Sequence, residues 1–511
     1  MDRNLIHEYL RSASGDAPAL IFGSQTLSFG ELAERADRLA ALVLEATEPG
    51  DRVAIVGHNS VDYVAALYGV PRAGRILTLL NQRLTPAEMA AVVADCGAAM
   101  VLGDAPFVDD LEPVLPPGVQ TVARFAPGWL DAMAPIDEAA APAGGGDTDT
   151  AWLIYTSGTT GPAKGAMLTH ASLGAAVEVT AAGRPVEPED VYLFPFPLCH
   201  VAAYNVLVQH AHGRPVVLLE RFDAAEVLRL VPAHRVTTMS LAPTMMAMLL
   251  DHPDFSRVAM ASVRVVGYGA SGPPEALLRR FLTETDAGLA QGYGMTELSG
   301  NAVFLTPDDH RRGLADRPEL LQAAGRPAPG VSLRIVDAGK QTTLVDVAPG
   351  TVGEIAIRSR QLLSAYWNRP DATAAALVEG WLRTGDMGRV DEEGYLYVVD
   401  RLKDIIVTGG ENVSSREVEQ VLFDHPGVAE AAVVAVPDPE WGEAICAVIV
   451  RRPGRGGEAD VSPAEIVQHC RDRLAGFKKP RHVLFRDDLP TNASGKVLKP
   501  DVRHWAHQQL R

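Results

Sequence analysis

The sequence predicts an α/β protein with a large N-terminal domain of helix-covered parallel sheets, a β-rich subdomain and a small C-terminal α+β domain. Between about residues 25 and 300, short runs of Val, Ile, Leu and Ala alternate with longer helical patterns. Such alternation is typical of parallel strands joined by crossover helices that cover both faces of a sheet. The pattern changes near residue 330 and again after residue 401, and these changes divide the chain.

The first part of the chain carries the α/β pattern. Its expected helices read FGELAERADRLAALVLEA at 29–46 and TPAEMAAVVADCG at 85–97, with apolar residues three and four apart. Its expected strands are the apolar runs RVAIVG, AAMVLG, PVVLLE, VTTMSLAP and VRVVGYG. A low-complexity segment at 137–149 is typical of a surface linker.

The later part of the chain contains shorter alternating strands. Strands expected at 331–337, 353–359 and 394–401 predict a β-rich subdomain over about residues 325–401. After residue 401 a new order of helix, two strands, helix and strand has the length of a small domain. We therefore expect a large domain over residues 1–401 and a small one over residues 405–511.

Composition limits the functional class. The chain has 511 residues and a formal net charge of −18 at pH 7, which disfavours nucleic acids and anionic membranes as partners. The four cysteines are far apart and form no CxxC pair, which fits a reducing compartment. The N-terminus has no signal-peptide pattern, and prolines and a histidine interrupt the apolar segment Val191–Gly213. We expect a cytoplasmic protein without a transmembrane segment, and the sequence leaves open whether it forms a homodimer.

The stretch LIYTSGTTGPAKGAMLTH, at 153–170, predicts a phosphate-binding loop after a strand. It is not a Walker loop, because Lys164 is followed by Gly165 and not by a hydroxyl residue. Its glycines let backbone N–H groups converge on an anion, while hydroxyls and a lysine add donors and charge. An ordinary flexible turn is the alternative. The residues assigned to phosphate binding are Thr156, Ser157, Gly158, Thr159, Thr160, Gly161 and Lys164.

Five further stretches accompany this loop: QGYGMTE at 291–297, WLRTGD at 381–386, DRLKD at 400–404, GGEN at 409–412 and LPTNASGK at 489–496. In this order and spacing they resemble the adenylate-forming superfamily of acyl-CoA synthetases, luciferases and peptide-synthetase adenylation domains. The resemblance covers nearly the whole chain and is strongest to bacterial fatty-acid–CoA ligases. It implies an AMP-forming acid–thiol ligase that uses ATP and Mg²⁺, with CoA as co-substrate.

The resemblance also implies roles for single residues. Tyr293 would stack on adenine, Thr296 would touch phosphate, and Glu297 would hold Mg²⁺, although an acid at a helix N-terminus is the alternative reading of Glu297. Lys496 would stabilise the substrate carboxylate and the α-phosphate as a mobile point charge. The other implied ATP contacts are Gly269, Ala270, Ser271, Gly292, Gly294 and Met295, with Asp386 and Arg401 on the ribose.

The second half-reaction implies a hinge and a CoA site. Lys403 matches the hinge position of the family, so residues 402–404 would let a mobile small domain rotate between two poses. Aromatic side chains would hold the adenine of CoA and cations its phosphates, while two glycines would let the pantetheine arm pass. The residues implied are Arg83, Gly409, Gly410, Trp441, Phe477, Lys479 and Arg481.

The resemblance places the acyl site after PFPLCH and at two strand ends. The implied lining is Val201, Ala202, Ala203, Tyr204, Asn205, Met239 and Tyr268, with His200 as a catalytic gate or a buried core histidine. The lining has no carboxylate for an α-amine, which argues against amino acids. The favoured function is a medium- or long-chain fatty-acid–CoA ligase. The alternatives are an aryl-carboxylate–CoA ligase, an acyl-AMP ligase that loads a carrier protein, and a non-catalytic binding protein.

Overall fold

A computed structural model describes residues 5–136, 146, 148–156, 163–269, 272–340, 342–452, 461–491 and 497–510. The chain forms two compact units, which are treated separately below. The first unit comprises Met1–Ser157, Pro162–Leu333 and Ile357–Leu382. The second comprises Gly158–Gly161, Arg334–Ala356 and Arg383–Arg511.

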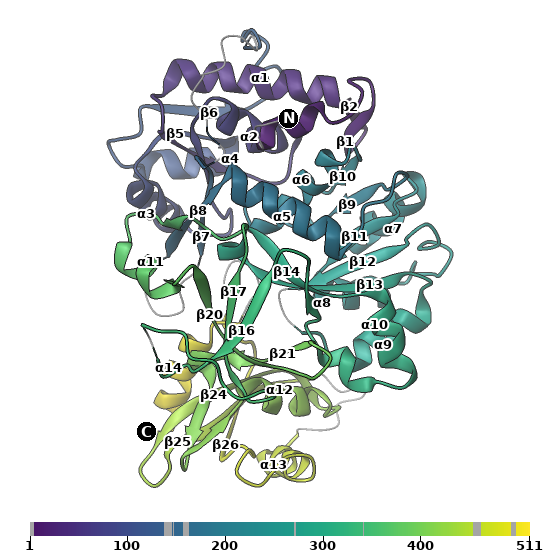
Figure 1. Cartoon of the computed structure of the whole chain (residues 1–511), viewed down its shortest axis with the longest axis vertical. Helices are drawn as coiled ribbons and strands as arrows, with labels where there is room; N and C mark the ends of the chain where they lie inside the picture. The colour runs from purple at the N-terminus through teal and green to yellow at the C-terminus, as the bar shows by residue number, and fades with distance from the viewer. Residues whose placement is uncertain are drawn as a thin grey trace. The chain divides into compact units, whose positions relative to one another are not determined.

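The first unit contains a seven-stranded sheet (Figure 1). The five strands from β7 to β6 run parallel, and the two strands at the other end, β8 and β18, each run antiparallel to their neighbours. The strand order is β18 (Ala365–Tyr366), β8 (Lys164–Thr169), β7 (Thr150–Thr156), β4 (Ile76–Leu79), β3 (Arg52–Val56), β5 (Ala98–Asp104) and β6 (Thr121–Phe125). The helices α3 (Pro86–Cys96) and α4 (Ala105–Leu111) bury apolar side chains against β3 and β5. The expected helix-covered parallel sheet is therefore confirmed.

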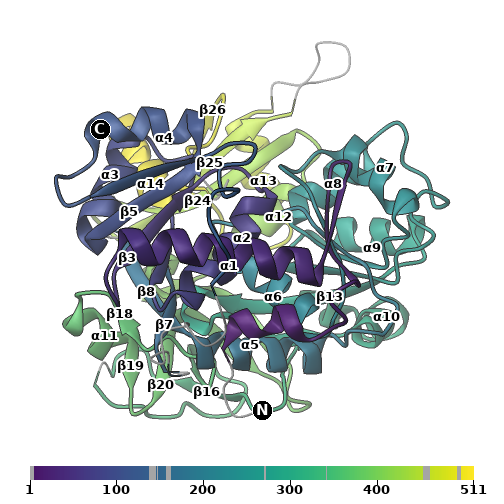
Figure 2. The ribbon, with the colours of Figure 1, turned by 90° about the horizontal axis from the view of Figure 1, so that it is seen from above.

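Helix α1 (Phe29–Ala46) lies alongside α2 (Val61–Arg72) (Figure 2). Its residues coincide with the predicted helix, because Ser28 and Glu31 form a capping box that fixes the first turn. Thr85 and Glu88 cap α3 in the same way, with Pro86 in its first turn. On α2, the carbonyl of Leu67 accepts a hydrogen bond from the indole of the fully buried Trp152, which anchors the helix to β7.

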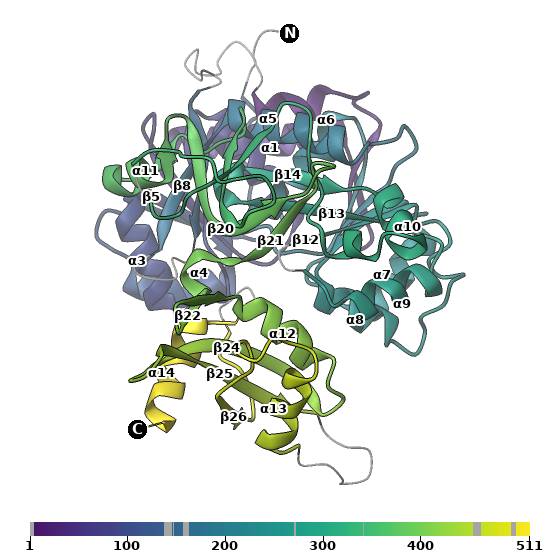
Figure 3. The same ribbon diagram turned by 60° about the horizontal axis from the view of Figure 1, so that its bottom comes forward.

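The first unit also contains a nine-stranded sheet. Its order is β15 (Arg326–Pro327), β14 (Gly300–Leu305), β13 (Gly288–Met295), β12 (Val265–Gly269), β11 (Thr238–Leu241), β9 (Tyr192–Phe194), β10 (Val216–Leu218), β1 (Pro18–Phe22) and β2 (Gln25–Ser28). One face packs against α7 (Ala224–Ala233), α8 (Pro243–Leu250) and α9 (Glu275–Glu284). The other faces α5 (His170–Gly183) and α6 (Tyr204–Ala211) (Figure 3). Helix α10 (Pro307–Ala315) follows β14. The segment Val191–Gly213 is mostly buried in this sheet and in α6, as predicted.

A third sheet corresponds to the predicted β-rich subdomain. Its order is β16 (Ser332–Val336), β17 (Gly353–Arg358), β20 (Trp381–Val390) and β19 (Leu377–Val378), and β21 (Leu396–Arg401) also pairs with β20. Between β18 and β19 lies α11 (Pro370–Ala376). The register of β20 and β21 places Asp386 opposite Arg401.

The C-terminal residues of the second unit form a sheet with helices on both faces. The sheet comprises β23 (Glu411–Val413), β22 (Ile406–Thr408), β25 (Gly442–Arg451) and β24 (Val428–Asp438), with β26 (His482–Arg486) beside β25. Side chains alternate along the long strands, so Val433 and Ile445 pack against α12 (Ser415–Phe423) and α13 (Pro463–Arg471). Val434 and Cys446 pack against α14 (Lys499–Gln509) on the other face (Figure 3).

One helix in this part of the chain is shorter than its sequence pattern predicts. The pattern at 464–477 predicts a longer helix than α13, which ends at Arg471 because the N–H groups of Arg473 and Leu474 both turn back to the carbonyl of Cys470.

All four cysteines of the chain are buried and unpaired. No helix in the described ranges has the length and apolar character to cross a bilayer.

Candidate adenylating and thioester-forming site

Strands β7 and β8 position the ends of the predicted phosphate loop. They are neighbouring antiparallel strands, and Thr156 at the end of β7 lies opposite Lys164 at the start of β8. The Thr156 hydroxyl donates to the Lys164 carbonyl over 3.4 Å. The two strands thus bring the loop ends together. The intervening predicted residues Ser157, Gly158, Thr159, Thr160 and Gly161 lie outside the described residues, so their role stays a prediction.

A short chain of contacts links Lys164 to Glu297. The Lys164 ammonium lies 5.4 Å from the ring centroid of Tyr366, within cation–π range. The Tyr366 hydroxyl donates to Glu297 Oε1 over 2.7 Å. Burial, and then the charge of Glu297, raise the pKa of Tyr366, so its hydroxyl remains a donor at neutral pH. The structure thereby brings a loop cation and the predicted magnesium ligand to one place.

The turn that carries Glu297 is held from several sides. Glu297 and Thr296 lie in a 3-10 turn (Thr296–Leu298), and Ser299 follows with a left-handed φ of 53°. Such a conformation is uncommon for a residue other than glycine and persists only where its surroundings fix it. The fully buried Gln361 side-chain amide donates to the carbonyls of Leu298, the last residue of the turn, and Asn301, just beyond Ser299. The Glu297 carboxylate is therefore presented on a fixed backbone.

The donor set around Glu297 fits a magnesium ion bound together with nucleotide. Mg²⁺ prefers carboxylate oxygens and commonly takes its remaining ligands from phosphates and water. Within the described part of the chain, no cluster of three or more His, Cys, Asp and Glu side chains forms a self-sufficient metal cage. Glu297 offers a second carboxylate oxygen beyond the one that Tyr366 contacts. A single carboxylate of this kind suits an ion that arrives with its phosphate ligands.

The predicted nucleotide contacts on β12 and β13 lie side by side. Gly269 pairs with Gly292 in parallel register. A Cβ at Gly269 would come within 2.5 Å of the Gly292 carbonyl oxygen, so a side chain there would push the strand ends apart. Tyr293, Gly294, Met295 and Thr296 continue along this edge and are half-buried. Ala270 and Ser271 lie outside the described residues.

In the second unit, Asp386 and Arg401 form an ion pair over 2.8 Å, between adjacent strands β20 and β21. The Asp386 side chain is buried, whereas Arg401 is 40% exposed and keeps further N–H donors available. The structure thus joins the two predicted ribose ligands to each other. Their role as ribose ligands stays a prediction.

The predicted hinge is followed by a buried polar anchor. Lys403 lies in the 3-10 turn Leu402–Asp404. The preceding Asp400 is 6% exposed and accepts hydrogen bonds from the backbone N–H groups of Ser415 (2.6 Å) and Arg416 (3.3 Å) at the start of α12. Asp400 therefore holds the segment before the hinge to the first helix after it. Lys496 lies outside the described residues, and its catalytic role stays a prediction.

The predicted CoA contacts of the second unit form an exposed aromatic and cationic surface. Trp441 is 42% exposed and Phe477 is 45% exposed. The Arg481 guanidinium lies 5.3 Å from the Trp441 ring centroid and is held there by Asp438 over 2.8 Å. Gly409 packs beneath the Trp441 ring at a φ of 59°, where any side chain would clash with the indole. An exposed indole beside a guanidinium is suited to a nucleotide base and its phosphate.

Not every cation near this surface is available. The Lys478 ammonium binds both carboxylate oxygens of Glu417 over 2.7 and 2.8 Å. Lys479 is half-buried, and Gly410 adopts a left-handed φ of 83°. Arg83 is exposed and belongs to the first unit.

His200 is a neutral group at the start of the predicted acyl segment. Burial, and then the charge of Arg83, lower its pKa to about 4. The imidazole therefore remains uncharged at pH 7 and brings no cation to the acyl site. It precedes a short 3-10 turn (Val201–Ala203) in which Val201 and Ala202 are half-buried and Ala203 is fully buried.

The structure divides the predicted acyl residues between two faces of the nine-stranded sheet. Met239 and Tyr268 belong to the core that packs on α7, α8 and α9. The Tyr268 hydroxyl lies 2.8 Å from His310 Nε2 in the same buried region. Tyr204 lies on α6, over the opposite face, and its hydroxyl contacts Thr180 on α5 and the backbone N–H of Asn301. The seven residues predicted to line the acyl site therefore do not all face the same side of the sheet.

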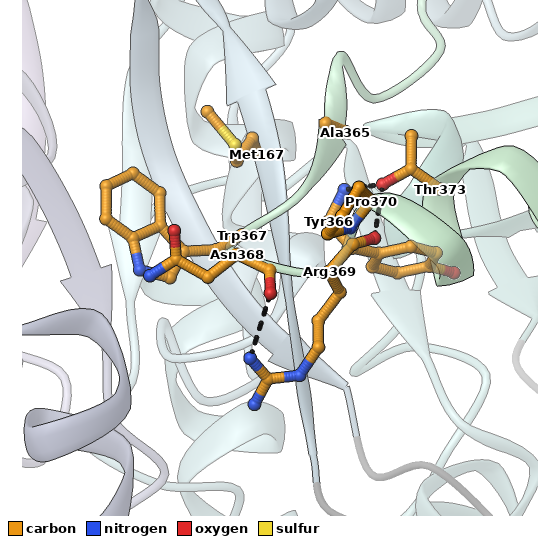
Figure 4. Close-up of a pocket in the computed structure, with 8 residues that line it drawn as sticks. All are labelled: Met167, Ala365, Tyr366, Trp367, Asn368, Arg369, Pro370 and Thr373. Carbon is orange, nitrogen blue, oxygen red and sulfur yellow. Dashed lines mark hydrogen bonds between the residues drawn. The ribbon is translucent and has the colours of Figure 1, made fainter.

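A shallow hollow of about 480 Å³ adjoins Tyr366 (Figure 4). It lies where β8 and β18 meet the start of α11, and Thr373 Oγ1 accepts a hydrogen bond from the Tyr366 N–H within it. Its lining residues are Met167, Ala365, Tyr366, Trp367, Asn368, Arg369, Pro370 and Thr373. None of these was among the predicted site residues. Tyr366 could not be predicted from the sequence. Its role is indicated only by its hydrogen bond to Glu297, which lies 69 positions away in the chain.

Comparison with known proteins gives the family of the chain. The AMP-binding enzyme family matches residues 9–367, and the AMP-binding enzyme C-terminal domain matches residues 417–496. The chain is 36% identical to a fatty acid–[acyl-carrier-protein] ligase, ScoC, of Streptomyces coeruleorubidus, over 95% of this chain and 93% of that protein. It is 35% identical to a long-chain-fatty-acid–CoA ligase, FadD13, of Mycobacterium tuberculosis, over 92% and 90%. It is 37% identical to a feruloyl-CoA synthase of an Amycolatopsis species, over 96% of each chain.

Solved structures agree. The o-succinylbenzoate CoA synthetase of Bacillus subtilis, in complex with its acyl-adenylate intermediate, superposes with a TM-score of 0.86 at 31% identity and 98% coverage of both chains. The same enzyme in complex with ATP and a magnesium ion also gives a TM-score of 0.86 at 31% identity, covering 97% of this chain and 98% of that one. The predicted enzyme class, an AMP-forming acid–thiol ligase, is confirmed. The chain belongs to the AMP-binding enzyme family, the adenylate-forming superfamily that its motifs predict.

Proposed function

We propose that the chain is an ATP-dependent carboxylate–CoA ligase that activates a medium- or long-chain aliphatic acid or an aryl acid. In the first half-reaction a carboxylate oxygen attacks the α-phosphorus of ATP, the bond to the β-phosphate oxygen breaks, and acyl-AMP and pyrophosphate form. In the second, the CoA thiol attacks the acyl carbon, loses its proton, and displaces AMP to give the thioester. The contact from Lys164 through Tyr366 to Glu297 is the observation that supports this proposal best.

The described residues would contribute mainly charge and positioning to the first step. A magnesium ion on Glu297 would neutralise charge on the departing pyrophosphate. Lys164 would add a cation at the edge of the phosphate loop, and Lys496 would act at the α-phosphate. The substrate carboxylate is itself the nucleophile, so the reaction needs no general base, and a neutral His200 is compatible with it.

CoA is the acceptor that the second unit supports best. The exposed Trp441 ring, in the turn between β24 and β25, and the Arg481 guanidinium, just before β26, would bind the base and a phosphate of CoA. A carrier protein is the second candidate, because the ScoC relative is named as a ligase for acyl-carrier protein. A carrier protein presents its thiol on a pantetheine arm without a nucleotide, so it would not need the Trp441 pair.

The sequence and the named relatives both bear on the identity of the acyl group. The sequence favours a medium- or long-chain fatty acid, and the named relatives include enzymes for fatty and aryl acids. Tyr204 places a bonded hydroxyl on the α6 side of the sheet, and Met239 and Tyr268 lie on its other face.

A two-readout assay tests the proposal. Aliphatic acids from acetate to palmitate and a set of benzoates and cinnamates are supplied with Mg·ATP, and pyrophosphate release is measured with and without CoA. The thioester is measured separately by mass spectrometry. We expect acid-dependent pyrophosphate release and a CoA thioester. Pyrophosphate release followed by loading of only a pantetheinylated carrier protein would select the second candidate, and no acid-dependent release would refute the ligase proposal.

A further inference from the structure

A polar cluster lies on the α5 and α6 side of the nine-stranded sheet, next to the predicted acyl residues. We call it the Arg184 cluster, and its members are Arg184, Tyr192, Asn205 and Ser240. Arg184 follows α5, Asn205 lies on α6, and Tyr192 and Ser240 lie on strands β9 and β11. The motifs of the family do not include Arg184, Tyr192 or Ser240, and the sequence predicted an apolar lining here.

The guanidinium of Arg184 is fixed by this cluster. Its Nη1 donates to Ser240 Oγ over 2.9 Å, and its Nη2 donates to Asn205 Oδ1 over 2.6 Å. The Asn205 amide is itself oriented, because its Nδ2 donates to the Ala202 carbonyl over 3.0 Å. Asn205 and Ser240 are each less than a tenth exposed, whereas Arg184 is half-buried.

The sheet leaves space for this guanidinium. Gly267 pairs with Ser240 in the neighbouring strand β12. A Cβ at Gly267 would collide with Arg184 Nη1 and would lie 3.0 Å from Ser240 Oγ. The Tyr192 ring adds an aromatic surface whose centroid is 5.7 Å from the Arg184 guanidinium carbon. Arg184 is therefore accommodated by the backbone, an aromatic ring and two oriented oxygens.

The charge of Arg184 has no anionic counterpart among the described residues. No ion pair in these ranges includes Arg184, and its hydrogen-bond acceptors Ser240 and Asn205 are neutral. Burial raises the pKa values of Tyr192 and Tyr204, and the Arg184 charge acts on both in the opposite direction. Two hydrogen bonds occupy two of the five guanidinium N–H donors. The site thus combines a held cation with remaining donor capacity.

We propose that Arg184 selects acids that carry a second oxygen acceptor, preferably a second carboxylate, at the end remote from the carboxylate that is activated. This inference rests on the proposed function. A carboxylate or another acceptor oxygen would complete the hydrogen bonds of the guanidinium, and a planar guanidinium recognises carboxylates well. A terminal methyl group would displace water from the guanidinium without offering a hydrogen-bond acceptor in its place, which raises the free energy of binding.

The test is a matched substrate series. Unsubstituted, ω-hydroxy and ω-carboxy acids of four to twelve carbons, and benzoates with and without a para carboxylate, are compared by kcat/KM for acid-dependent pyrophosphate release. We expect an acceptor-bearing acid to be preferred over the plain acid of equal length by about ten- to hundred-fold, as for a hydrogen bond to a charged group. If the wild-type kcat/KM for plain acids equalled or exceeded that for acceptor-bearing acids at every chain length, the inference would be overturned.

Two variants assign the preference to this residue. Arg184→Met retains much of the side-chain length and removes the charge, so it should abolish the preference by lowering kcat/KM for the acceptor-bearing acids and raising it for the plain acids. Arg264→Met is the matched control, because Arg264 lies just before β12 and already pairs with Asp190 over 2.7 Å. An equal loss for all acids in Arg184→Met would mean a structural role and would overturn the inference. Absence of acid-dependent pyrophosphate release in the wild type would instead refute the proposed function.

Discussion

The Tyr366 hydroxyl donates to Glu297 Oε1 over 2.7 Å and joins two segments that are 69 positions apart in the sequence. The bond occupies one carboxylate oxygen and so fixes the direction in which the other oxygen points. Leu363, three residues before Tyr366, also donates its N–H to the Glu297 carbonyl over 2.8 Å. The segment that carries Tyr366 therefore positions both the backbone and the side chain of the proposed magnesium ligand.

We predict that Tyr366→Phe raises the Mg²⁺ concentration needed for half-maximal pyrophosphate release by about ten-fold, as expected for a lost hydrogen bond to a charged group. The measurement is a Mg²⁺ titration at saturating ATP and acid. Tyr397→Phe is the control, because the Tyr397 hydroxyl bonds a different carboxylate, that of Asp391, over 3.3 Å in the β-rich sheet. An unchanged Mg²⁺ requirement in Tyr366→Phe would argue against its positioning role.

The acceptor site gives a second prediction. Trp441→Ala should raise the KM for CoA by about ten-fold or more, since stacking of a base on an aromatic side chain contributes roughly 1–3 kcal/mol. Pyrophosphate release in the absence of CoA should stay near the wild-type rate. Phe423→Ala on α12 removes another exposed aromatic group of the same unit, 39% exposed, and should leave both values unchanged. A normal CoA KM in Trp441→Ala would argue against this CoA site and would favour a carrier protein as the acceptor.

Local patterns explain how much of the fold could be predicted. Helix α1 coincides with the prediction because its apolar spacing and the capping pair Ser28 and Glu31 lie within one stretch of sequence. Strands β3, β5, β10, β11 and β12 were found for a similar reason, since buried parallel strands are short apolar runs. Asp386 and Arg401 were each assigned to the ribose from their motifs, whereas their ion pair with each other appears only in the folded sheet.

Contacts between distant segments could not be predicted in this way. Arg184 and Gly267 are 83 positions apart, and only the folded sheet makes the glycine a space for the guanidinium. The separation of Met239 from Tyr204 depends on which face of β11 each strand position presents, and a four-residue strand gives too short a pattern to show this. The polar character of the predicted acyl region therefore emerged only from the structure.

Buried histidines give a prediction for stability. Burial is the largest cause that lowers the pKa of His7 to about 3 and the pKa values of His200, His210 and His310 to about 4. In the unfolded chain these groups take up protons near pH 6.5, whereas the folded chain excludes them until the pH is much lower. The unfolded state therefore binds more protons between about pH 6.5 and 4, so the stability present at pH 7 is lost as the pH falls through this window.

The expected result is a fall in Tm between pH 7 and pH 5 at constant ionic strength. Each of the four histidines contributes up to about 1.4 kcal/mol per pH unit once its unfolded form is protonated. His310→Gln should make the dependence of unfolding free energy on pH shallower, and His504→Gln, at an exposed position on α14, should not. A pH dependence that is equal in both variants would contradict the assignment to buried histidines.

The last prediction separates the two half-reactions by two variants of the second unit. Lys496 is expected to act on the carboxylate and the α-phosphate only while acyl-AMP forms. Lys496→Ala should therefore lower acyl-AMP formation by about a hundred- to thousand-fold, as for removal of a group that stabilises transition-state charge. It should still convert chemically prepared acyl-AMP and CoA to thioester. Lys403→Pro should do the reverse, because proline fixes φ near −65° and restricts rotation at the hinge.

Both half-reactions are measured on each variant, with Lys403→Ala as the control for side-chain loss at the hinge. Asp400 is hydrogen-bonded across the hinge to the start of α12, so a rotation at the turn Leu402–Asp404 must break these hydrogen bonds. Restricting one φ angle there should let acyl-AMP form and accumulate. Circular dichroism and Tm establish that each variant is folded. If folded Lys496→Ala and Lys403→Pro lost both half-reactions in equal proportion, a rotation between two poses could not be the basis of catalysis in this chain.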